Sequence, residues 1–328
     1  MGLADLIQNA WAKQSKWLVL LRPLSMLYRT IFTLQKNNKL KGAYRAPVPV
    51  MIIGNITVGG SGKTPLIISL VKHLQDHNIR VAVISRGYGG KGEFPALVTS
   101  QSLASQVGDE PTLIVQSTQV PMAVGPNRQA AIELLLQHHQ VDLILSDDGL
   151  QHFALQRDIE WVVVDAVRGF GNQKLLPEGY LREPLSRLNE VTVIEHHPQP
   201  DSELNMHLQA GQPFCLGGAL EEFNRSHTFI AVVGIGYPER FFSTLNALSI
   251  VHKPAIFPDH HAYTVNDFKH LKENLIITTT KDAVKLQELF NGQPDILKRI
   301  WVVPVEAKLS DRCYDVLHQQ LQPYNLSL

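Results

Sequence analysis

The chain has 328 residues, 44% of them hydrophobic, and its 30 basic and 30 acidic side chains cancel to a formal net charge of zero. This is an ordinary globular composition, long enough for a full core and two domains. The two cysteines, Cys215 and Cys313, lie far apart and outside any C-x-x-C motif, so the sequence indicates neither a disulfide framework nor a zinc site.

The zero net charge hides an asymmetry along the chain. Residues 1–45 contain eight Lys or Arg side chains and a single Asp, a net charge of +7, whereas the remaining residues hold 22 basic and 29 acidic side chains, a net charge of −7. The acidic main body argues against a nucleic-acid partner. The basic N-terminal segment is a separate electrostatic unit.

The same segment has helical hydrophobic periodicity. Apolar residues recur at three- and four-residue spacing up to residue 22, and a second stripe follows Pro23: Leu24, Leu27, Tyr28, Ile31 and Phe32. The longest apolar run, Trp17 to Leu21, is far shorter than the roughly 20 residues that cross a bilayer. Two alternatives remain, helices that pack on the protein's own core or helices that lie in a membrane interface. The basic polar face and the tryptophans favour the second, so we expect residues 1–45 to form membrane-associating amphipathic helices.

A strand, a glycine-rich turn and a helix start follow at residues 48–65, VPVMIIGNITVGGSGKTP. In such a turn, backbone N–H groups point at a polyphosphate that sits on the positive end of the next helix. Lys63 is then placed to reach the β- and γ-phosphates of ATP, and Thr64 to hold Mg²⁺. The usual pattern G-x-x-x-x-G-K-[ST] has a glycine where this chain has Thr57, so the match is to the tighter variant G-G-x-G-K-T. The predicted nucleotide-binding residues are Thr57, Val58, Gly59, Gly60, Ser61, Gly62, Lys63 and Thr64.

From residue 46 onward, apolar strands alternate with helical stretches, which predicts a mostly parallel sheet of the P-loop NTPase type, covered on both faces. Residues 199–226 are polar with scattered Gly, Pro and Asn, and we expect the domain boundary there. The expected domains are a P-loop kinase core at 46–210 and a smaller α/β domain at 211–328. The predicted strands lie at 50–53, 81–85, 120–124, 141–145, 161–165, 191–195, 229–233, 250–255, 275–279 and 299–303, and the predicted helices at 64–75, at 128–138 and from 310.

Two carboxylates end the apolar strand at 141–146. In P-loop proteins, an acid at this place reaches Mg²⁺ beside the phosphate loop, and Asp147 or Asp148 is expected to be that acid. Without the loop, the pair would equally suit an Asx cap. His152, four residues further on, either orients an acidic neighbour or is a buried histidine.

Three further stretches place charged side chains next to proline, which makes the backbone rigid, or glycine, which makes it permissive: GDEP at 108–111, LREP at 181–184 and FPDHH at 257–261. Each alone is more typical of a solvated loop or a helix N-cap, but their number favours function. Asp109 suits a general base for a hydroxyl, with Asp259 and His260 assisting. Arg86 and Arg128 are candidates for phosphate contacts on the acceptor side.

The motifs TVGGSGKTP, SRGYGG, VGDEP, GPNR, SDDGLQH, LREP, FPDHHAY and TTTKDAVKL, in this order, resemble the tetraacyldisaccharide 4'-kinase (lipid A 4'-kinase) family between about Ile53 and Leu286. The resemblance implies a P-loop kinase, peripheral to the cytoplasmic face of the bacterial inner membrane. It would use ATP and Mg²⁺ to phosphorylate the 4'-hydroxyl of a tetraacylated glucosamine disaccharide 1-phosphate. The implied partners are this lipid and the membrane surface, with no nucleic acid and no protein partner.

The resemblance also assigns residues by motif. The implied catalytic residues are Asp109, His260, Lys63 and Asp147. The implied metal ligands are Thr64, Asp148 and Glu183. The implied substrate contacts are Arg86, Tyr88, Arg128, His152 and Arg182. The last forty residues contain no chemistry that the sequence identifies.

Two other classes of function remain open. G-G-x-G-K-T loops also occur in GTP-dependent metallochaperones and targeting GTPases, which read guanine through [NT]-K-x-D. The stretch Thr280-Lys281-Asp282-Ala283 comes close, but its aspartate stands one residue early. The other class is an ATPase that binds a membrane or a partner without modifying a small substrate.

Overall fold

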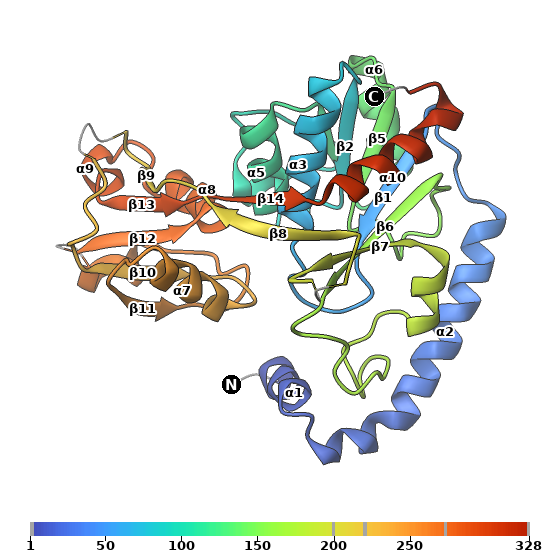
Figure 1. The fold of residues 1–328 in the computed structure, drawn as a ribbon, viewed down its shortest axis with the longest axis horizontal. Coiled ribbons are helices and arrows are strands. Elements are labelled where there is room, and N and C mark those ends of the chain that lie inside the picture. Colours follow the sequence, from blue (N-terminus) through green and yellow to red (C-terminus); the bar gives the residue numbers. More distant parts are fainter. Residues whose placement is uncertain (1–2, 199–200, 219–221, 272–273, 327–328) are drawn as a thin grey trace.

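The computed structural model describes residues 3–198, 201–218, 222–271 and 274–326. Within these residues the chain forms two β-sheets, a large one and a small one, each flanked by helices (Figure 1). The strands of the large sheet, in spatial order, are β14 (Val305–Leu309), β8 (Asn205–Ala210), β7 (Thr192–His196), β6 (Ile159–Asp165), β1 (Val50–Gly54), β5 (Leu143–Asp147), β2 (Val81–Ser85), β4 (Met122–Val124) and β3 (Ala96–Val98).

All neighbours in this sheet are parallel except the two edge pairs, β14 with β8 and β3 with β4. The central strand β1, VMIIG, is buried at every position, as expected for a parallel strand covered on both faces. It lies between β5 and β6. The order therefore reverses at β1, and ligands of such sheets bind where the strands end at this switch point.

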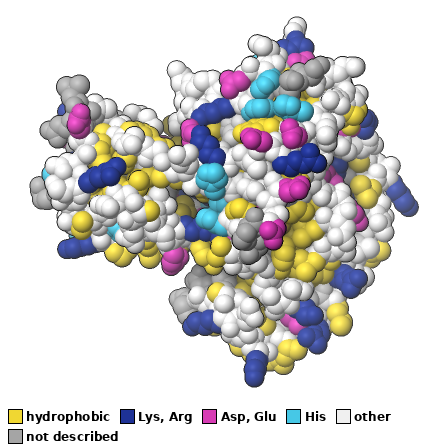
Figure 2. Space-filling view, in the orientation of Figure 1, with side chains coloured by type: hydrophobic (Ala, Val, Ile, Leu, Met, Phe, Trp, Pro, Cys, Tyr) yellow, Lys and Arg dark blue, Asp and Glu magenta, His cyan; other side chains and the backbone are white. Residues whose placement is uncertain are grey.

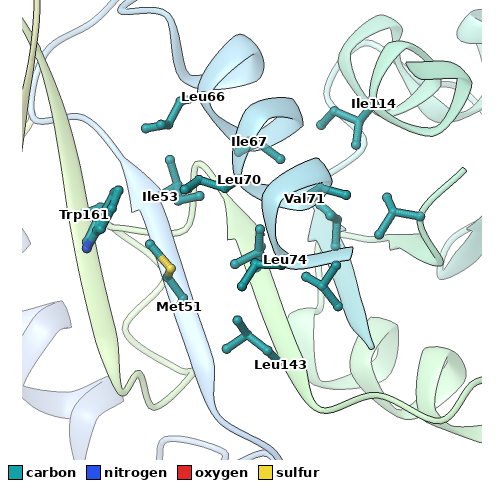
Figure 3. Close-up of a cluster of buried hydrophobic side chains, with 14 of the residues drawn as sticks. Met51, Ile53, Leu66, Ile67, Leu70, Val71, Leu74, Ile114, Leu143 and Trp161 are labelled. Carbon is teal, nitrogen blue, oxygen red and sulfur yellow. The ribbon is translucent and has the colours of Figure 1, made fainter. Parts of the chain in front are cut away.

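Helices cover both faces of the large sheet. One face packs against α3 (Lys63–Asp76), α5 (Asp109–Thr118) and α10 (Asp311–Leu321), and the other against α6 (Arg128–His138). Figure 3 shows the first face, where Leu66, Leu70 and Leu74 of α3 lie over β1 and β5. These side chains are spaced three to four residues apart and fully buried, so the helix after the glycine-rich turn is fixed to the sheet by its apolar stripe. The short α4 (Ala104–Val107) precedes α5.

The small sheet has the order β11 (His252–Ile256), β10 (Phe229–Val233), β12 (Leu275–Thr279), β13 (Ile300–Val303) and β9 (Phe214–Cys215), with only β9 antiparallel among these described strands. The helix α7 (Pro238–Ala247) packs on one face, and α8 (Thr280–Leu289) with the 3₁₀ segment Val265–Leu271 packs on the other. The short α9 (Pro294–Leu297) follows α8. This arrangement confirms the predicted second, smaller α/β unit.

The predicted strands and helices agree with the structure to within about two residues at each end. The polar stretch 199–226 needs correction: its first residues, 199–200, and residues 219–221 lie outside the described part, but the rest contains β8 and β9. β8 is an edge-proximal strand with alternating, half-exposed side chains, so it lacks the continuous apolar run of a central strand.

The expected domain at 211–328 also needs correction at its end. β14 pairs with β8 in the large sheet, and α10 packs into the core of that sheet through Leu317 and Leu321. Trp161 of β6 donates a hydrogen bond from Nε1 to Gln320 Oε1 at 2.8 Å. The last residues therefore return to the large unit, and β8 and β14 form a two-stranded connection between the two (Figure 1).

The N-terminal segment is helical, as predicted. It consists of α1 (Leu3–Ala12), a 3₁₀ turn (Lys16–Leu21) and the 20-residue α2 (Arg22–Lys41), which runs along the outside of the large unit (Figure 1). Pro23 lies in the first turn of α2, where a missing N–H costs nothing, so it starts the helix. Among the described helices, none is both long and apolar enough to cross a membrane.

Candidate active site

The glycine-rich turn closes directly on α3. Gly62 is the N-cap of α3 and has a left-handed φ of 94°. A Cβ at this position would lie 2.8 Å from Met206 Cε and 3.1 Å from His196 Nδ1, so packing as well as conformation requires glycine. Asn55 spans the loop, donating from Nδ2 to Gly59 O at 3.2 Å. The backbone N–H groups at the start of α3 are thereby presented to an anion.

Neighbouring strands support the loop. The Val58 N–H donates to Tyr180 O at 2.9 Å, and His196 Nδ1 lies 3.2 Å from Ser61 O. Burial lowers the pKa of His196 to about 4, so the ring is neutral at pH 7 and holds the loop by a neutral hydrogen bond. The Ser61 hydroxyl is buried and has no partner among the described residues, which leaves a donor for a phosphate oxygen.

The register of β1 and β5 places the acidic pair beside this turn. Ile53, just before the turn, is the parallel neighbour of Asp147, which is the last residue of β5. Asp147 is buried; Ser85 Oγ donates to its Oδ2 at 3.3 Å, whereas its Oδ1 has no partner among the described residues. Burial, together with the nearby Glu110 carboxylate, raises the pKa of Asp147 to about 7. A divalent cation at the free oxygen would return this carboxyl to its ionised form.

Asp148 has a different environment. It adopts a left-handed φ of 47°, and its carboxylate lies 3.3 Å from Lys63 Nζ and 3.0 Å from Arg182 Nη1. Although burial opposes ionisation, these two cations hold the pKa of Asp148 far below its usual range. Lys63, which is expected to bind phosphate, is thus already in contact with Asp148, which is expected to bind metal.

Mg²⁺ usually takes one or two carboxylates, with phosphate oxygens and water completing an octahedron. The oxygens of Thr64, Asp147 and Asp148 suit that demand. Among the residues that the structure describes, no group of three or more His, Cys, Asp or Glu side chains forms a closed metal site.

Glu183, the third predicted metal ligand, is as fully buried as Asp147. It is buried, its Oε1 accepts a hydrogen bond from Gln151 Nε2 at 2.7 Å, and its Oε2 lies 3.4 Å from Arg187 Nε. Burial raises the pKa of Glu183 despite these partners. Both oxygens of Glu183 have protein partners, whereas Oδ1 of Asp147 has none among the described residues, so Asp147 is the better candidate for the metal and the role of Glu183 stays a prediction.

The predicted base and its helper meet across the two units. Asp109 is the first residue of α5 in the large unit, follows Gly108 with φ of 102°, and is 7% exposed. Its Oδ2 lies 3.1 Å from Nδ1 of His260, which belongs to the loop after β11 in the small unit. Burial opposes ionisation of Asp109, but the hydrogen bond to His260 and the nearby lysines lower its pKa below the ordinary value. A carboxylate that is ionised and oriented in this way can accept a proton from a hydroxyl.

Three of the predicted substrate residues suit contact with a ligand. Arg86 is exposed, and Tyr88 is 64% exposed with its ring edge-on to His260 at a centroid distance of 5.0 Å. His152 is half-buried, and burial lowers its pKa to about 4. Their roles stay predictions.

The two remaining arginines are used within the protein. Arg128 is 3% exposed, its guanidinium donates to Gly125 O at 2.9 Å and Asp147 O at 3.2 Å, and its Nε has no partner among the described residues, so the phosphate contact stays a prediction. Burial lowers its pKa to about 10. Arg182 pairs with Asp148, and its carbonyl accepts a hydrogen bond from Tyr28 of α2 at 2.8 Å.

Sequence reasoning missed three groups that the fold brings to the site. Gln151 joins Glu183 to the Asn55 carbonyl, at 3.3 Å. His196 belongs to no motif of the sequence, and its position at the loop depends on the pairing of β6 with β7. Lys281 and Lys285 contact the Asp109–His260 pair from α8, and their four-residue spacing is the signal that they share a helix face.

Known proteins are similar to this chain over most of its length. A family model described as tetraacyldisaccharide-1-P 4'-kinase matches residues 17–322. Similar proteins named tetraacyldisaccharide 4'-kinase include one from Psychrobacter cryohalolentis, 47% identical with 100% of this chain and 99% of that protein covered. Another, from Actinobacillus pleuropneumoniae serotype 5b, is 44% identical with 92% and 94% covered.

Among solved structures, the chain is similar to the "apo" form of LpxK from Aquifex aeolicus in complex with ATP. The TM-score is 0.76 at 26% identity, covering 94% of this chain and 99% of that one.

Replacing Lys63 with alanine should remove phosphoryl transfer while leaving the fold intact, because its ammonium neutralises charge on the transferring group. We expect a loss on the order of 10³-fold in kcat, which is typical for such a contact. Lys72→Ala is the matched control, since Lys72 is exposed on the same helix and pairs with Glu306 at the surface. Steady-state turnover and circular dichroism measure both variants, and wild-type turnover in Lys63→Ala would contradict the phosphate-loop assignment.

Replacing Asp109 with asparagine should slow the chemical step by roughly 10²- to 10⁴-fold with little change in ATP affinity, because the base does not contact the nucleotide. His260→Ala should have a similar effect. Since the two side chains act as a unit, the double variant should be little slower than the slower single variant. Single-turnover rates and ATP titrations test this, and additive losses would show that the two residues act independently.

Proposed function

Because the chain belongs to the tetraacyldisaccharide-1-P 4'-kinase family, we propose that it transfers the γ-phosphate of ATP to the 4'-hydroxyl of a tetraacylated glucosamine disaccharide 1-phosphate. It is an ATP-dependent kinase of lipid A biosynthesis. The observation that supports the assignment of residues most strongly is the Asp109–His260 pair beside a phosphate loop. A P-loop hydrolase needs to orient water alone, whereas a kinase needs a base for a substrate hydroxyl.

The base and the phosphate loop belong to one site. A Cβ at Gly236 of the small unit would lie 2.9 Å from Asp259 Oδ2 and 3.9 Å from the Gly60 N. The loop that includes Asp259 and His260 therefore faces the glycine-rich turn. Figure 2 shows histidine and basic side chains gathered where the large and the small unit meet.

Each residue then has a chemical role in the transfer. The N-terminus of α3 and Lys63 bind the phosphates and stabilise the charge that develops on the transferring group. Bound Mg²⁺, held by Thr64 with Asp147 and Asp148, would supply Lewis-acid neutralisation of the phosphates. Asp109 accepts the proton of the 4'-hydroxyl. At the same time the hydroxyl oxygen bonds to the γ-phosphorus, and the bond between the γ-phosphorus and the oxygen that leaves with ADP breaks. His260 orients Asp109 through Nδ1 and keeps it ionised.

The environment of Asp282 argues against the alternative of a GTPase. Its Oδ2 accepts hydrogen bonds from Gly234 N at 3.0 Å and Thr279 Oγ1 at 2.9 Å, and the side chain is fully buried. Lys285 Nζ lies 2.9 Å from its other oxygen. Asp282 therefore organises the start of α8 and is not free to read a guanine base.

The N-terminal helices supply the means to approach a lipid acceptor. The inner face of α2 packs on the large unit through Ser25, Tyr28 and Phe32. Its outer stripe is exposed: Leu24 53%, Leu27 55%, Ile31 44% and Leu34 58%. Figure 2 shows hydrophobic and basic side chains interspersed in the lower part of the molecule, where α1 and α2 lie. An apolar stripe flanked by Lys and Arg favours an interfacial helix on an anionic membrane, which for this reaction is the cytoplasmic face of the inner membrane.

Incubation of the purified protein with ATP, Mg²⁺ and the tetraacylated disaccharide 1-phosphate should add one phosphate to the lipid. Mass spectrometry detects the addition, and ³¹P NMR shows whether the new monoester lies at the 4' position. Lys63→Ala is the control for contaminating kinases. ATP hydrolysis without lipid phosphorylation would favour the ATPase alternative, and a requirement for GTP would favour the GTPase.

Replacing Leu24, Leu27, Ile31 and Leu34 with glutamine should weaken membrane binding while preserving the inner face of α2. If each side chain contributes about 1 kcal/mol when partly immersed, the combined loss lowers the vesicle partition coefficient by roughly 10³-fold. Cosedimentation with anionic vesicles at low and high salt measures this, because salt weakens the charge contribution and not the apolar one.

The matched control for this variant replaces polar residues of α2, Thr30, Thr33, Asn37 and Asn38, with glutamine and should bind vesicles as the wild type does. If the stripe variant also binds vesicles normally and phosphorylates lipid in bilayers at the wild-type rate, α2 is not a membrane anchor.

A further inference from the structure

The stretch TTTKDAVKL at 278–286 begins α8, and the functions assigned above leave its lysines without a role. Thr279 caps the helix, accepting a hydrogen bond from Asp282 N at 3.1 Å. This fixes the direction of the first turn. Lys281 and Lys285, four residues apart, then lie on the face of α8 that meets α5 of the large unit.

The ammonium of Lys281 lies beside the Asp109–His260 pair. Its Nζ is 3.0 Å from Glu110 Oε1, 3.3 Å from His260 Nε2 and 3.8 Å from Asp259 Oδ1, and the side chain is 19% exposed. Although burial opposes protonation, the carboxylates of Glu110, Asp109 and Asp259 hold the pKa of Lys281 above its usual range. Lys281 is therefore an ammonium at neutral pH.

An ammonium has three donors and no acceptor. His260 Nε2 must therefore be the acceptor in its contact with Lys281, which means that Nε2 has no proton. The proton of neutral His260 is then on Nδ1, the nitrogen that lies 3.1 Å from Asp109 Oδ2. The same contact removes Nε2 from the list of possible bases, because its lone pair already accepts from Lys281.

We propose that Lys281 is a positioning residue that fixes His260 in its Nδ1–H tautomer and, through its ion pair with Glu110, holds that histidine of the small unit against the base of the large unit. This inference rests on the proposed kinase function. It assigns proton acceptance to Asp109 alone, with His260 as a hydrogen-bond donor throughout the step.

Other charged groups also lie near the Asp109–His260 pair and influence where the proton of His260 is held. Asp259, on the same loop as His260, has its Oδ1 3.9 Å from Nε2, and Lys285 Nζ is 3.9 Å from Asp109 Oδ2. The ring of Tyr88 closes the side toward β2. Asp259 attracts a proton to Nε2, whereas the closer Lys281 opposes it, so loss of Lys281 frees Nε2 to take a proton.

The kinetic test compares Lys281→Met with Lys281→Arg. Methionine has similar length but cannot donate, so kcat should fall by about 10- to 100-fold, less than for removal of the base itself. The KM for ATP should stay within about twofold. Arginine is also a permanent cation that only donates hydrogen bonds, so Lys281→Arg should retain most of the wild-type kcat. Lys269→Met, on the exposed side of the 3₁₀ segment in the same unit, is the matched control and should behave as wild type.

The spectroscopic test reads the tautomer directly. The protein is labelled with ¹⁵N-histidine, and the signals of His260 are assigned by their absence in His260→Gln. The hydrogen bond to Asp109 raises the pKa of His260 above its ordinary value, so the spectrum is recorded at a pH at which the ring has become neutral. Long-range ¹H–¹⁵N correlation should then show a protonated Nδ1 and a bare Nε2. In Lys281→Met, Nε2 should become partly protonated. A wild-type spectrum with the proton on Nε2, or wild-type kcat in Lys281→Met, would overturn the proposal.

The two hypotheses fail separately. If the wild-type protein adds no phosphate to the lipid, the proposed kinase function is wrong, and the spectrum of His260 still reports whether Lys281 sets its tautomer. The wild-type spectrum does not depend on Lys281→Met, so it decides the tautomer even if that variant does not fold.

Discussion

The hydrogen bond between Asp109 and His260 joins the large and the small unit, and the proposed chemistry of the protein depends on it. Neither unit contains a complete site. The large unit supplies the phosphate loop, the acidic pair and the base, whereas the small unit supplies the histidine that orients the base and the lysines that surround it. The contact of α5 with α8 therefore sets the geometry of proton transfer, and any movement of one unit against the other changes it.

The phosphate end of the site depends on register and close packing. Parallel pairing of β1 with β5 places Ile53, the last but one residue of β1, next to Asp147, and the left-handed Gly62 lets α3 begin at once. His196 and Met206 fill the space beneath the loop so closely that no side chain fits at Gly62. The loop is thus preorganised, which is what electrostatic catalysis of phosphoryl transfer requires.

The sequence predicted the parts of this protein that depend on local patterns. The central strands are continuous apolar runs, and the glycine-rich turn is set by conformation, so both could be recognised without a structure. β8 and β14 could not be recognised in this way, because they are half-exposed and their pairing joins segments about 100 residues apart. The same limit explains Arg128: an arginine after a Gly-Pro-Asn turn suits a phosphate, and only the packing of α6 shows that its guanidinium is buried against carbonyls.

The central claim is that Asp109, presented across the two units by His260, accepts the hydroxyl proton during phosphoryl transfer. The most direct measurement is the solvent isotope effect on a single turnover, with enzyme in excess over the lipid acceptor so that product release does not contribute. The account predicts slower transfer in D₂O than in H₂O of matched viscosity, and the loss of this difference in Asp109→Asn. Equal rates in the two solvents for the wild-type protein would contradict it.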